Sequence, residues 1–464
     1  MALTEQKREN FGSKLGFVLA AAGSAVGLGN IWAFPYVVGS NGGAAFIIVY
    51  LLCVSIIGLP VLLAEVLIGR TSQRNPVGAF KSLSNSKFWH SVGGMGIVAG
   101  FVILSFYAVV AGWSFGYIFE ALSGHFIHFV QPQEAVDHFN SLTGSPFWIV
   151  GMLALFMLLT MIIVVFGVQK GIEKGSKIMM PLLFILLIGV MIRGITLEGS
   201  SAGIEFLFNP DWSKISGTTV IIALGQAFFT LSLGMGAMLT YGSYMSKKDN
   251  VVTSAAEIVV IDTSIALIAG IAIFTSVFAI GLDPSEGVGL IFHTLPIVFS
   301  KMTGGYLFSI IFFILLFIAA LTSAISLLEV VTSYFVDEKK WDRKKAVFIL
   351  GFIAFLLGIP SALSFNLMAD FKIFGMNVFD LAFYITFNIM LPLGGFLISI
   401  FVAWIWGLDK AVIELKKGAE KLFESSMWQI SLWKLFLKYF APISIFIVLL
   451  NSLGLLDIIL NLFK

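Results

Sequence analysis

Long apolar segments follow one another through most of this chain, and each approaches or exceeds the roughly 20 residues that a helix needs to cross a bilayer. With 58% hydrophobic residues, 12% charged residues and a mean hydropathy of +0.99, the composition lies far from that of a soluble domain. We therefore predict an all-α polytopic membrane protein with about 11 transmembrane helices. The expected spans are residues 14–38, 42–69, 92–120, 146–167, 177–197, 218–245, 251–281, 304–336, 345–364, 378–406 and 438–462.

The distribution of lysine and arginine predicts the orientation of these spans. An odd number of spans places the two termini on opposite sides of the membrane. If the N-terminus is inside, about 23 of the 28 lysine and arginine residues fall in inner segments, as the positive-inside rule requires. We therefore expect a cytoplasmic N-terminus and an outward-facing C-terminus.

Two of the apolar segments are interrupted in the middle by small residues. The first carries residues 23–30 (GSAVGLGN), and the sixth carries residues 230–236 (TLSLGMG). Glycine costs about 1 kcal/mol in a helix interior, and backbone freed of its hydrogen bonds inside a bilayer is tolerated only where it lines a cavity or binds something. Paired broken helices mark the substrate and ion sites of transporters, so we predict a solute site within the membrane.

Other features exclude several functions. The net charge of +2 is too small to indicate nucleic-acid binding, and Cys53 lies in an apolar run where no disulfide can form. No nucleophile–base pair, nucleotide loop or metal cluster suggests an enzyme, and no soluble domain or obligate protein partner is evident. In the outer loop 121–145, four residues have spacings that could ligate a metal, although a solvated loop is the more ordinary interpretation. They are His125, His128, Asp137 and His138.

Three sequence stretches on three different expected helices resemble the neurotransmitter:sodium symporter family. They are AAAGSAVGLGNIWAFPYVVGSNGGAAF, GQAFFTLSLGMGAMLTYGSY and ALTSAISLLE. The resemblance implies one transporter domain over residues 1–464 with the leucine-transporter-like fold and discontinuous helices 1 and 6. It further implies a first repeat at 14–197, an inverted second repeat at 218–406 and an accessory helix at 438–462.

The resemblance also implies function. A family member of this kind is a sodium-coupled symporter that imports an amino acid through the bacterial inner (plasma) membrane by alternating access. The whole chain resembles tyrosine-transporting bacterial members, so tyrosine or another aromatic or large hydrophobic amino acid is the expected substrate. Two alternatives stay open: a symporter that prefers leucine or methionine, and a membrane sensor or scaffold that binds an amino acid without moving it.

Two sodium sites follow from the family motifs, and unwound carbonyls with short oxygen-bearing side chains suit sodium. The first sodium would be held by the carbonyls of Ala25 and Thr230 and the side chains of Asn30, Thr230 and Asp262. The second would be held by the carbonyls of Gly23, Val26 and Ala319 and the hydroxyls of Thr322 and Ser323. The alternative for these two hydroxyls is a hydrogen bond to their own helix.

The same motifs predict an amino-acid pocket whose carboxylate end is received by N–H groups after the first break. The residues expected to line it are Ala25, Gly27, Leu28, Gly29, Ile103, Tyr107, Phe229, Thr230, Ser232, Met235, Ser323, Ser326 and Leu327. Met235 is adaptable in shape, and Ser326 offers a hydroxyl to a polar tip, which favours a large aromatic side chain.

Asp262 is a carboxylate in the middle of an apolar span, which marks a functional site. In chloride-dependent relatives an anion beside the first sodium balances its charge, and a serine one turn further on helps to hold that anion. Here that position is Ala266, so we expect Asp262 to replace chloride and transport to be chloride-independent. Glu65, another intramembrane acid, is expected to bond N–H groups freed by the second break rather than to couple protons.

The gates depart from the family pattern on one side only. The outer ion pair of the family is replaced by Ala33 and Phe383, so the outer gate is expected to close by apolar packing. Both charges are expected to be absent together, because one charged residue without its partner would be partly buried and unpaired, which is energetically costly. On the inner side, Arg8 and Asp337 match the family's ion pair.

Overall fold

The computed structural model describes residues 9–282, 289–425, 427–456 and 458. In this part of the chain the regular elements are helices, joined by turns and short irregular segments, with one isolated bridge between Ile373 and Met376. Within it, nine helices are long and apolar enough to cross a membrane, and the bent pair Lys14–Ala25 and Gly29–Ser40 makes a tenth span. The expected span at 218–245 is divided into two short helices, Gly217–Thr230 and Ala237–Ser243, neither of which alone is long enough to cross a membrane.

The first half of the chain runs to residue 208 and includes several short π-helical turns inside or between α-helices. Its elements are α1 (Lys14–Ala25), η1 (Gly29–Ala33), α2 (Phe34–Ser40), α3 (Ala44–Cys53), η2 (Val54–Gly58), α4 (Leu59–Ser72), α5 (Pro76–Leu83), α6 (Lys87–Leu122), η3 (His125–His128), α7 (Pro132–Thr143), α8 (Pro146–Val165), η4 (Val168–Glu173), α9 (Lys174–Ile195) and α10 (Ser201–Phe208).

The second half repeats the alternation of long spans and short connecting helices. Its elements are η5 (Trp212–Lys214), α11 (Gly217–Thr230), α12 (Ala237–Ser243), α13 (Val251–Ala279), η6 (Leu290–Thr294), α14 (Leu295–Lys301), α15 (Gly305–Asp337), α16 (Arg343–Leu363), α17 (Val378–Phe383), η7 (Tyr384–Met390), α18 (Leu391–Ile400), η8 (Phe401–Gly407), α19 (Leu408–Lys416), α20 (Glu420–Ser425), α21 (Met427–Leu435), η9 (Phe436–Phe440) and α22 (Ala441–Ser452).

Side-chain caps fix the starts of the helices that carry the site. Ser13 accepts the Gly16 N–H at 3.0 Å at the start of α1, and Asn250 accepts the Thr253 N–H at 3.0 Å at the start of α13. Ser216 and Thr219 form a capping box at the start of α11. Because the first N–H groups of a helix have no partner within it, these caps determine where each helix begins.

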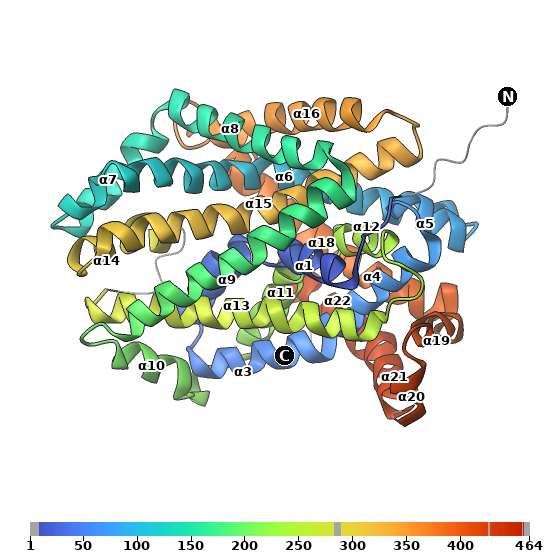
Figure 1. The fold of residues 1–464 in the computed structure, drawn as a ribbon. Helices are drawn as coiled ribbons and strands as arrows, with labels where there is room; N and C mark the ends of the chain where they lie inside the picture. Colours follow the sequence, from blue (N-terminus) through green and yellow to red (C-terminus); the bar gives the residue numbers. More distant parts are fainter. Residues whose placement is uncertain (1–8, 283–288, 426, 457, 459–464) are drawn as a thin grey trace.

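The helices form layers (Figure 1). α8 and α16 lie along one face, α6 and α15 run side by side beneath them, and α13 and α3 lie on the opposite face, with α1, α11 and α18 between. In the most apolar stretch of the central α15, 78% of the residues are buried, whereas in that of α8 only 33% are buried. The exposed sides of the outer helices carry large apolar side chains such as Phe147 and Phe352, as a lipid-facing surface requires.

Short helices gather at the two ends of the bundle (Figure 1). We call one end the α7 end, because α7, α10 and α14 lie there, and the other the α5 end, where α5, α12 and α19 lie. The predicted outer loop 121–145 thus contains the short helices η3 and α7. The last span also starts earlier than predicted, at Trp428 instead of residue 438.

Candidate functional site

The first broken helix opens between α1 and η1. Val26, at the end of α1, is extended, and its N–H bonds the Ala22 carbonyl at 2.7 Å. Helical bonding resumes through the Asn30 N–H and the Gly27 carbonyl at 3.2 Å, and the axis bends by 52°. All residues of this stretch are buried, so its unpaired carbonyls and N–H groups must find partners elsewhere in the protein.

The second break lies directly beside the first. Between α11 and α12, Ser232 has φ of 54° and Gly234 has φ of 82°, which is a left-handed turn that glycine adopts without strain. The freed N–H of Gly234 donates to Glu65 Oε1 at 2.7 Å, the type of bond that the sequence predicted for Glu65. The Ser232 hydroxyl donates to the Ser24 carbonyl at 2.9 Å, so one hydrogen bond joins the two breaks.

Asp262 of α13 lies at the centre of a buried polar cluster. Its Oδ1 accepts the Asn30 amide N–H at 2.7 Å, and its two carboxylate oxygens lie 3.1 and 3.0 Å from the Thr230 hydroxyl. Asn30 and Asp262 are fully buried, and Thr230 is 1% exposed. The cluster thus assembles three of the predicted sodium ligands from three separate helices, with hard oxygen atoms that suit a small cation.

A second oxygen cluster joins α15 to the first break. The Ser323 hydroxyl reaches the carbonyls of Gly23 at 3.4 Å, Ser24 at 3.1 Å and Val26 at 3.2 Å. The Thr322 hydroxyl lies 3.5 Å from the Val26 carbonyl and 2.9 Å from that of Ala319. Thr322 also bonds the Ile318 carbonyl at 3.2 Å, so the alternative of back-bonding holds for Thr322 but not for Ser323.

A small cavity lies between these two clusters. All the residues predicted for the amino-acid pocket line it except Thr230, which belongs to the Asp262 cluster. Its free space of about 30 Å³ holds one or two water molecules, so an amino acid fits only after side chains move. The Tyr107 hydroxyl accepts the Leu28 N–H at 3.3 Å at one side of this cavity.

Two further residues, Ser24 and Phe387, also line the cavity and were not predicted from the sequence. Ser24 donates its hydroxyl to Ser326 Oγ at 2.7 Å, and Ser326 donates in turn to the Ser323 carbonyl at 2.8 Å. Phe387 packs edge-on against Phe229, with ring centroids 4.5 Å apart. Both had a signal in the sequence: Ser24 lies inside the first break, and Phe387 continues an aromatic i, i+4, i+8 pattern.

On the side toward the α7 end, the cavity is closed by a wholly apolar chamber. Its walls are Leu28, Trp32, Phe106, Tyr107, Val110, Phe229, Phe379, Phe383 and Phe387. Phe383 is 38% exposed and packs on Phe387 with centroids 4.5 Å apart, as an apolar gate would require. The side chain that the η1 turn contributes to the walls is Trp32, not the predicted Ala33.

On the side toward the α5 end, an aromatic cluster and a buried ion pair close the path. The Phe11 ring packs edge-on against Tyr241 and Tyr244, at 5.7 and 6.2 Å between centroids. The Tyr244 hydroxyl donates to Glu329 at 2.6 Å, and Arg343 donates to the same carboxylate, with one bond of 3.2 Å. The Arg343 partner of Glu329 was missed, because nothing in its local sequence distinguishes it from the other cations of its loop.

The predicted inner-gate residue Asp337 lies at the α5 end, whereas Arg8 lies outside the described residues. Asp337 accepts the backbone and side-chain N–H groups of Asn75 at 3.1 and 3.3 Å. The adjacent Glu338 bonds Lys81 at 2.8 Å. Partial burial raises the pKa of Glu338, but the hydrogen bond and charge of Lys81 outweigh it, so the net pKa is lowered.

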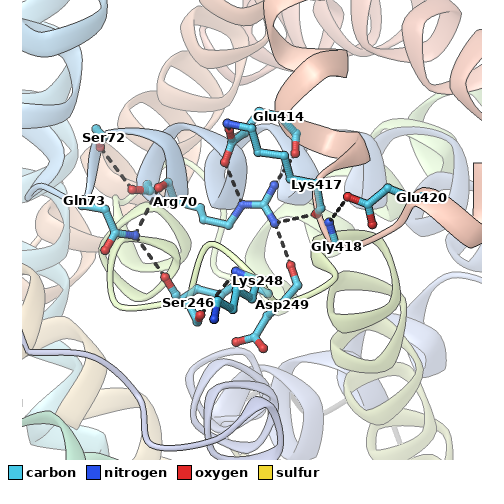
Figure 2. Close-up of polar contacts among 12 residues, drawn as sticks. Arg70, Ser72, Gln73, Ser246, Lys248, Asp249, Glu414, Lys417, Gly418 and Glu420 are labelled. Carbon is cyan, nitrogen blue, oxygen red and sulfur yellow. Dashed lines mark hydrogen bonds and ion pairs between the residues drawn. The ribbon is translucent and has the colours of Figure 1, made fainter.

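Arg70, in the last turn of α4, ties three elements together at the α5 end (Figure 2). Its guanidinium bonds the Glu414 carboxylate at 3.0 Å and the carbonyls of Asp249 at 2.7 Å and Lys417 at 3.2 Å, and it also bonds the Glu414 carbonyl. The Arg70 side chain is fully buried and that of Glu414 is 5% exposed. Arg70 therefore holds α19 and the turn before α13 against α4.

This architecture is that of a polytopic membrane transporter, and comparison with known proteins agrees. The sodium:neurotransmitter symporter family model matches residues 8–128 and 137–458. The chain belongs to this family. The predicted fold class, with two discontinuous helices, is confirmed.

Individual relatives are similar along their whole length. An uncharacterized sodium-dependent transporter of Bacillus subtilis, YhdH, is 41% identical, with 98% of this chain and 100% of the relative covered. A second, from Haemophilus influenzae, is 37% identical over 98% of this chain and 100% of the relative. The crystal structure of MhsT in complex with L-phenylalanine matches with a TM-score of 0.88 and 47% identity, covering 96% of this chain and 100% of that one. The class is thus a sodium-dependent transporter.

Proposed function

We propose that this protein is a sodium-coupled symporter that imports an aromatic amino acid, with tyrosine as the leading candidate, without a requirement for chloride. The observation that carries the proposal is the convergence of both broken helices on one cavity, with an oxygen cluster on each side of it. Both clusters use groups of the first break, Asn30 in one and the carbonyls of Gly23 and Val26 in the other.

Sodium binding in these clusters would couple to substrate binding through the first break. Sodium at the second cluster would join α15 to α1, because Ser323 already spans the two elements. Sodium at the Asp262 cluster would lie beside the expected position of the substrate carboxylate, next to the N–H groups of Leu28 and Gly29. Each ligand would then favour the same closed arrangement, which makes their binding cooperative.

Chloride independence follows from the charge of Asp262. A single sodium ion in a dry cluster of neutral oxygens leaves one positive charge unbalanced, and the fully buried Asp262 carboxylate supplies the opposite charge from within the protein. Ala266, one turn further along α13, is also fully buried and offers no hydroxyl to an anion.

The preference for an aromatic side chain rests on the cavity walls and on one relative. MhsT, which has been solved with L-phenylalanine, is 47% identical to this chain. Met235 can change shape to admit a ring, and the linked hydroxyls of Ser24 and Ser326 offer a hydrogen bond to a phenol. Leucine and methionine are the alternative substrates, because they would fit the same apolar walls.

Transport would proceed by alternating access between the two ends. The apolar chamber at the α7 end would be the outer gate, and the cluster of Phe11, Tyr244, Glu329 and Arg343 at the α5 end the inner gate. In this proposal the protein lies in the inner membrane of a bacterium, with the α5 end and the N-terminus facing the cytoplasm and the C-terminus outside; the excess of lysine and arginine in the expected inner segments supports this orientation. We further infer that helices in 14–197 and 218–406 form two inverted repeats, with 438–462 as an accessory helix.

The proposal is tested by measuring sodium-driven uptake of radiolabelled tyrosine into liposomes in competition with unlabelled amino acids, once with chloride and once with gluconate as the anion. Unlabelled tyrosine and phenylalanine should compete best, and uptake should be the same with either anion. Stronger competition by leucine or methionine would reassign the substrate, and loss of uptake without chloride would refute the role of Asp262. Binding of tyrosine without uptake would favour a sensor.

A further inference from the structure

We propose that Glu120, His125 and His138, at the α7 end, form a binding site for a divalent transition metal, of which Zn²⁺ is the best match. The site is separate from the transport cavity. Glu120 lies in the last turn of α6, more than three helical turns beyond Tyr107, the α6 residue that borders the cavity on this side.

The three side chains converge on one point. His125 Nδ1 lies 2.6 Å from Glu120 Oε2, and His138 Nε2 lies 3.1 Å from the same oxygen. One possible ligand atom from each residue lies within 4.8 Å of the other two. The two imidazole rings are neighbours, with centroids 5.5 Å apart and planes inclined by 55°. Two nitrogen donors and one carboxylate oxygen are thus presented to a shared position.

This set differs from the one that the sequence suggested. Asp137 instead accepts the Gln133 amide at 2.9 Å, and His128 is exposed and not part of the converging group. Glu120 was missed because it belongs to the preceding transmembrane helix. Three different elements, α6, η3 and α7, therefore supply the donors, which a ligand would cross-link.

Packing holds these elements in position. The His138 ring contacts the aromatic rings of Phe126 and Phe129, with centroids 6.2 and 5.6 Å away. Phe126 is itself stacked on Tyr117 of α6, at 5.3 Å between centroids. The donors thus lie on an apolar support that fixes ring orientation, as the surroundings of a metal site do.

The donor chemistry selects the class of metal. Two imidazoles with one carboxylate suit Zn²⁺ and neighbouring transition metals, whereas Mg²⁺ and Ca²⁺ prefer oxygen ligands alone. In a tetrahedral zinc site with bonds of about 2.0–2.1 Å, donor atoms lie about 3.3 Å apart. Here the two nitrogens lie 2.6 and 3.1 Å from Glu120 Oε2 and all three atoms lie within 4.8 Å of one another, so small side-chain shifts would admit the ion. Three protein ligands leave the fourth position to water, and the Ser123 hydroxyl, 3.0 Å from His125 Nδ1, lies beside the group.

A bound ion would fasten the loop helices to the end of α6. α7 in turn packs on η6, since Phe139 stacks on Phe292 with centroids 5.7 Å apart and meets His293 at 4.8 Å. Metal binding is therefore expected to stabilise the α7 end against thermal unfolding, as any ligand of the folded state does.

The test is calorimetric titration of the purified full chain, without a polyhistidine tag, with ZnCl₂ and separately with MgCl₂. We expect one saturable Zn²⁺ site and no Mg²⁺ site. Glu120→Gln, His125→Gln and His138→Gln should each weaken zinc binding at least about tenfold. His128→Gln is the matched control, since it removes an imidazole from the same turn and should leave zinc binding unchanged.

Two results would overturn the proposal: no saturable Zn²⁺ binding by the wild-type chain, or equal binding by the triple variant E120Q/H125Q/H138Q. A cooperative thermal unfolding transition, measured on each variant without added metal, shows that the chain is folded. Because zinc binding needs no transport, its failure is distinguishable from failure of the proposed symport.

Discussion

Replacing Asp262 with asparagine removes one negative charge from the sodium cluster and keeps its shape. The asparagine oxygen can still accept the Asn30 N–H, now 2.7 Å from Asp262 Oδ1, and the Thr230 hydroxyl can still bond there. The change therefore isolates the charge from the packing. If Asp262 supplies the charge that chloride provides in other family members, the variant should bind sodium weakly unless chloride is added.

The magnitude follows from Coulomb's law. A sodium ion bound among these oxygens would lie within about 4 Å of the carboxylate charge, an attraction of about 4 kcal/mol at an effective dielectric constant near 20. Allowing for relaxation of the site, we expect a loss of about 2–4 kcal/mol, or roughly 30- to 1,000-fold in sodium affinity. A sodium concentration that stabilises the wild type by about 2.7 kcal/mol would stabilise a variant with 100-fold weaker binding by about 0.4 kcal/mol.

The assay is a sodium titration of thermal stability and of amino-acid binding in detergent, with gluconate as the only anion and then with added chloride. Glu257→Gln is the matched control, because it makes the same change on the same helix at an exposed ion pair with Lys14. Sodium affinity of Asp262→Asn within threefold of the wild type in gluconate would refute the reasoning.

Three other substitutions test the second sodium site, the contact with a phenol and the buried Arg70 ion pair. Ser323→Ala removes the hydroxyl that reaches three carbonyls of the first break and should weaken sodium binding at least about tenfold; unchanged sodium titration would exclude the second site. Ser326→Ala should lower the tyrosine-to-phenylalanine uptake ratio up to about tenfold, as expected for one hydrogen bond, and an unchanged ratio would contradict its contact with a phenol. Arg70→Ala should destabilise the protein by about 3–5 kcal/mol in chemical unfolding, because four acceptor oxygens of Glu414, Asp249 and Lys417 lose their buried donor and Glu414 keeps only the exposed Lys417 as an ion-pair partner. Lys81→Ala, at an exposed pair, should change stability by less than about 1 kcal/mol, and equal effects of the two would contradict the assignment.

The spans and breaks were predictable from the sequence because they depend on local composition. Apolar runs of sufficient length set the helices, and clusters of small residues set the breaks, so the predicted span at 251–281 agrees with α13 (Val251–Ala279) within two residues. The span at 218–245 was predicted as one segment with a break, and it is two helices because the turn at Ser232 and Gly234 is too irregular to continue a helix.

Side-chain partners on different helices were not predictable. Arg343 meets Glu329, and Arg70 meets Glu414 across 344 positions, only because the tertiary fold brings their helices together. Nothing local marks either pair. The same holds for Glu120, whose role becomes visible only when α7 folds back over the end of α6.

In the proposed mechanism, sodium moving down its gradient drives an amino acid through the cavity between the two broken helices. The most direct measurement is tyrosine accumulation in proteoliposomes with an inward sodium gradient, compared with equal sodium on both sides. We expect tyrosine to accumulate above its external concentration only when the sodium gradient is present. Equal tyrosine levels under both conditions, with binding intact, would contradict this mechanism.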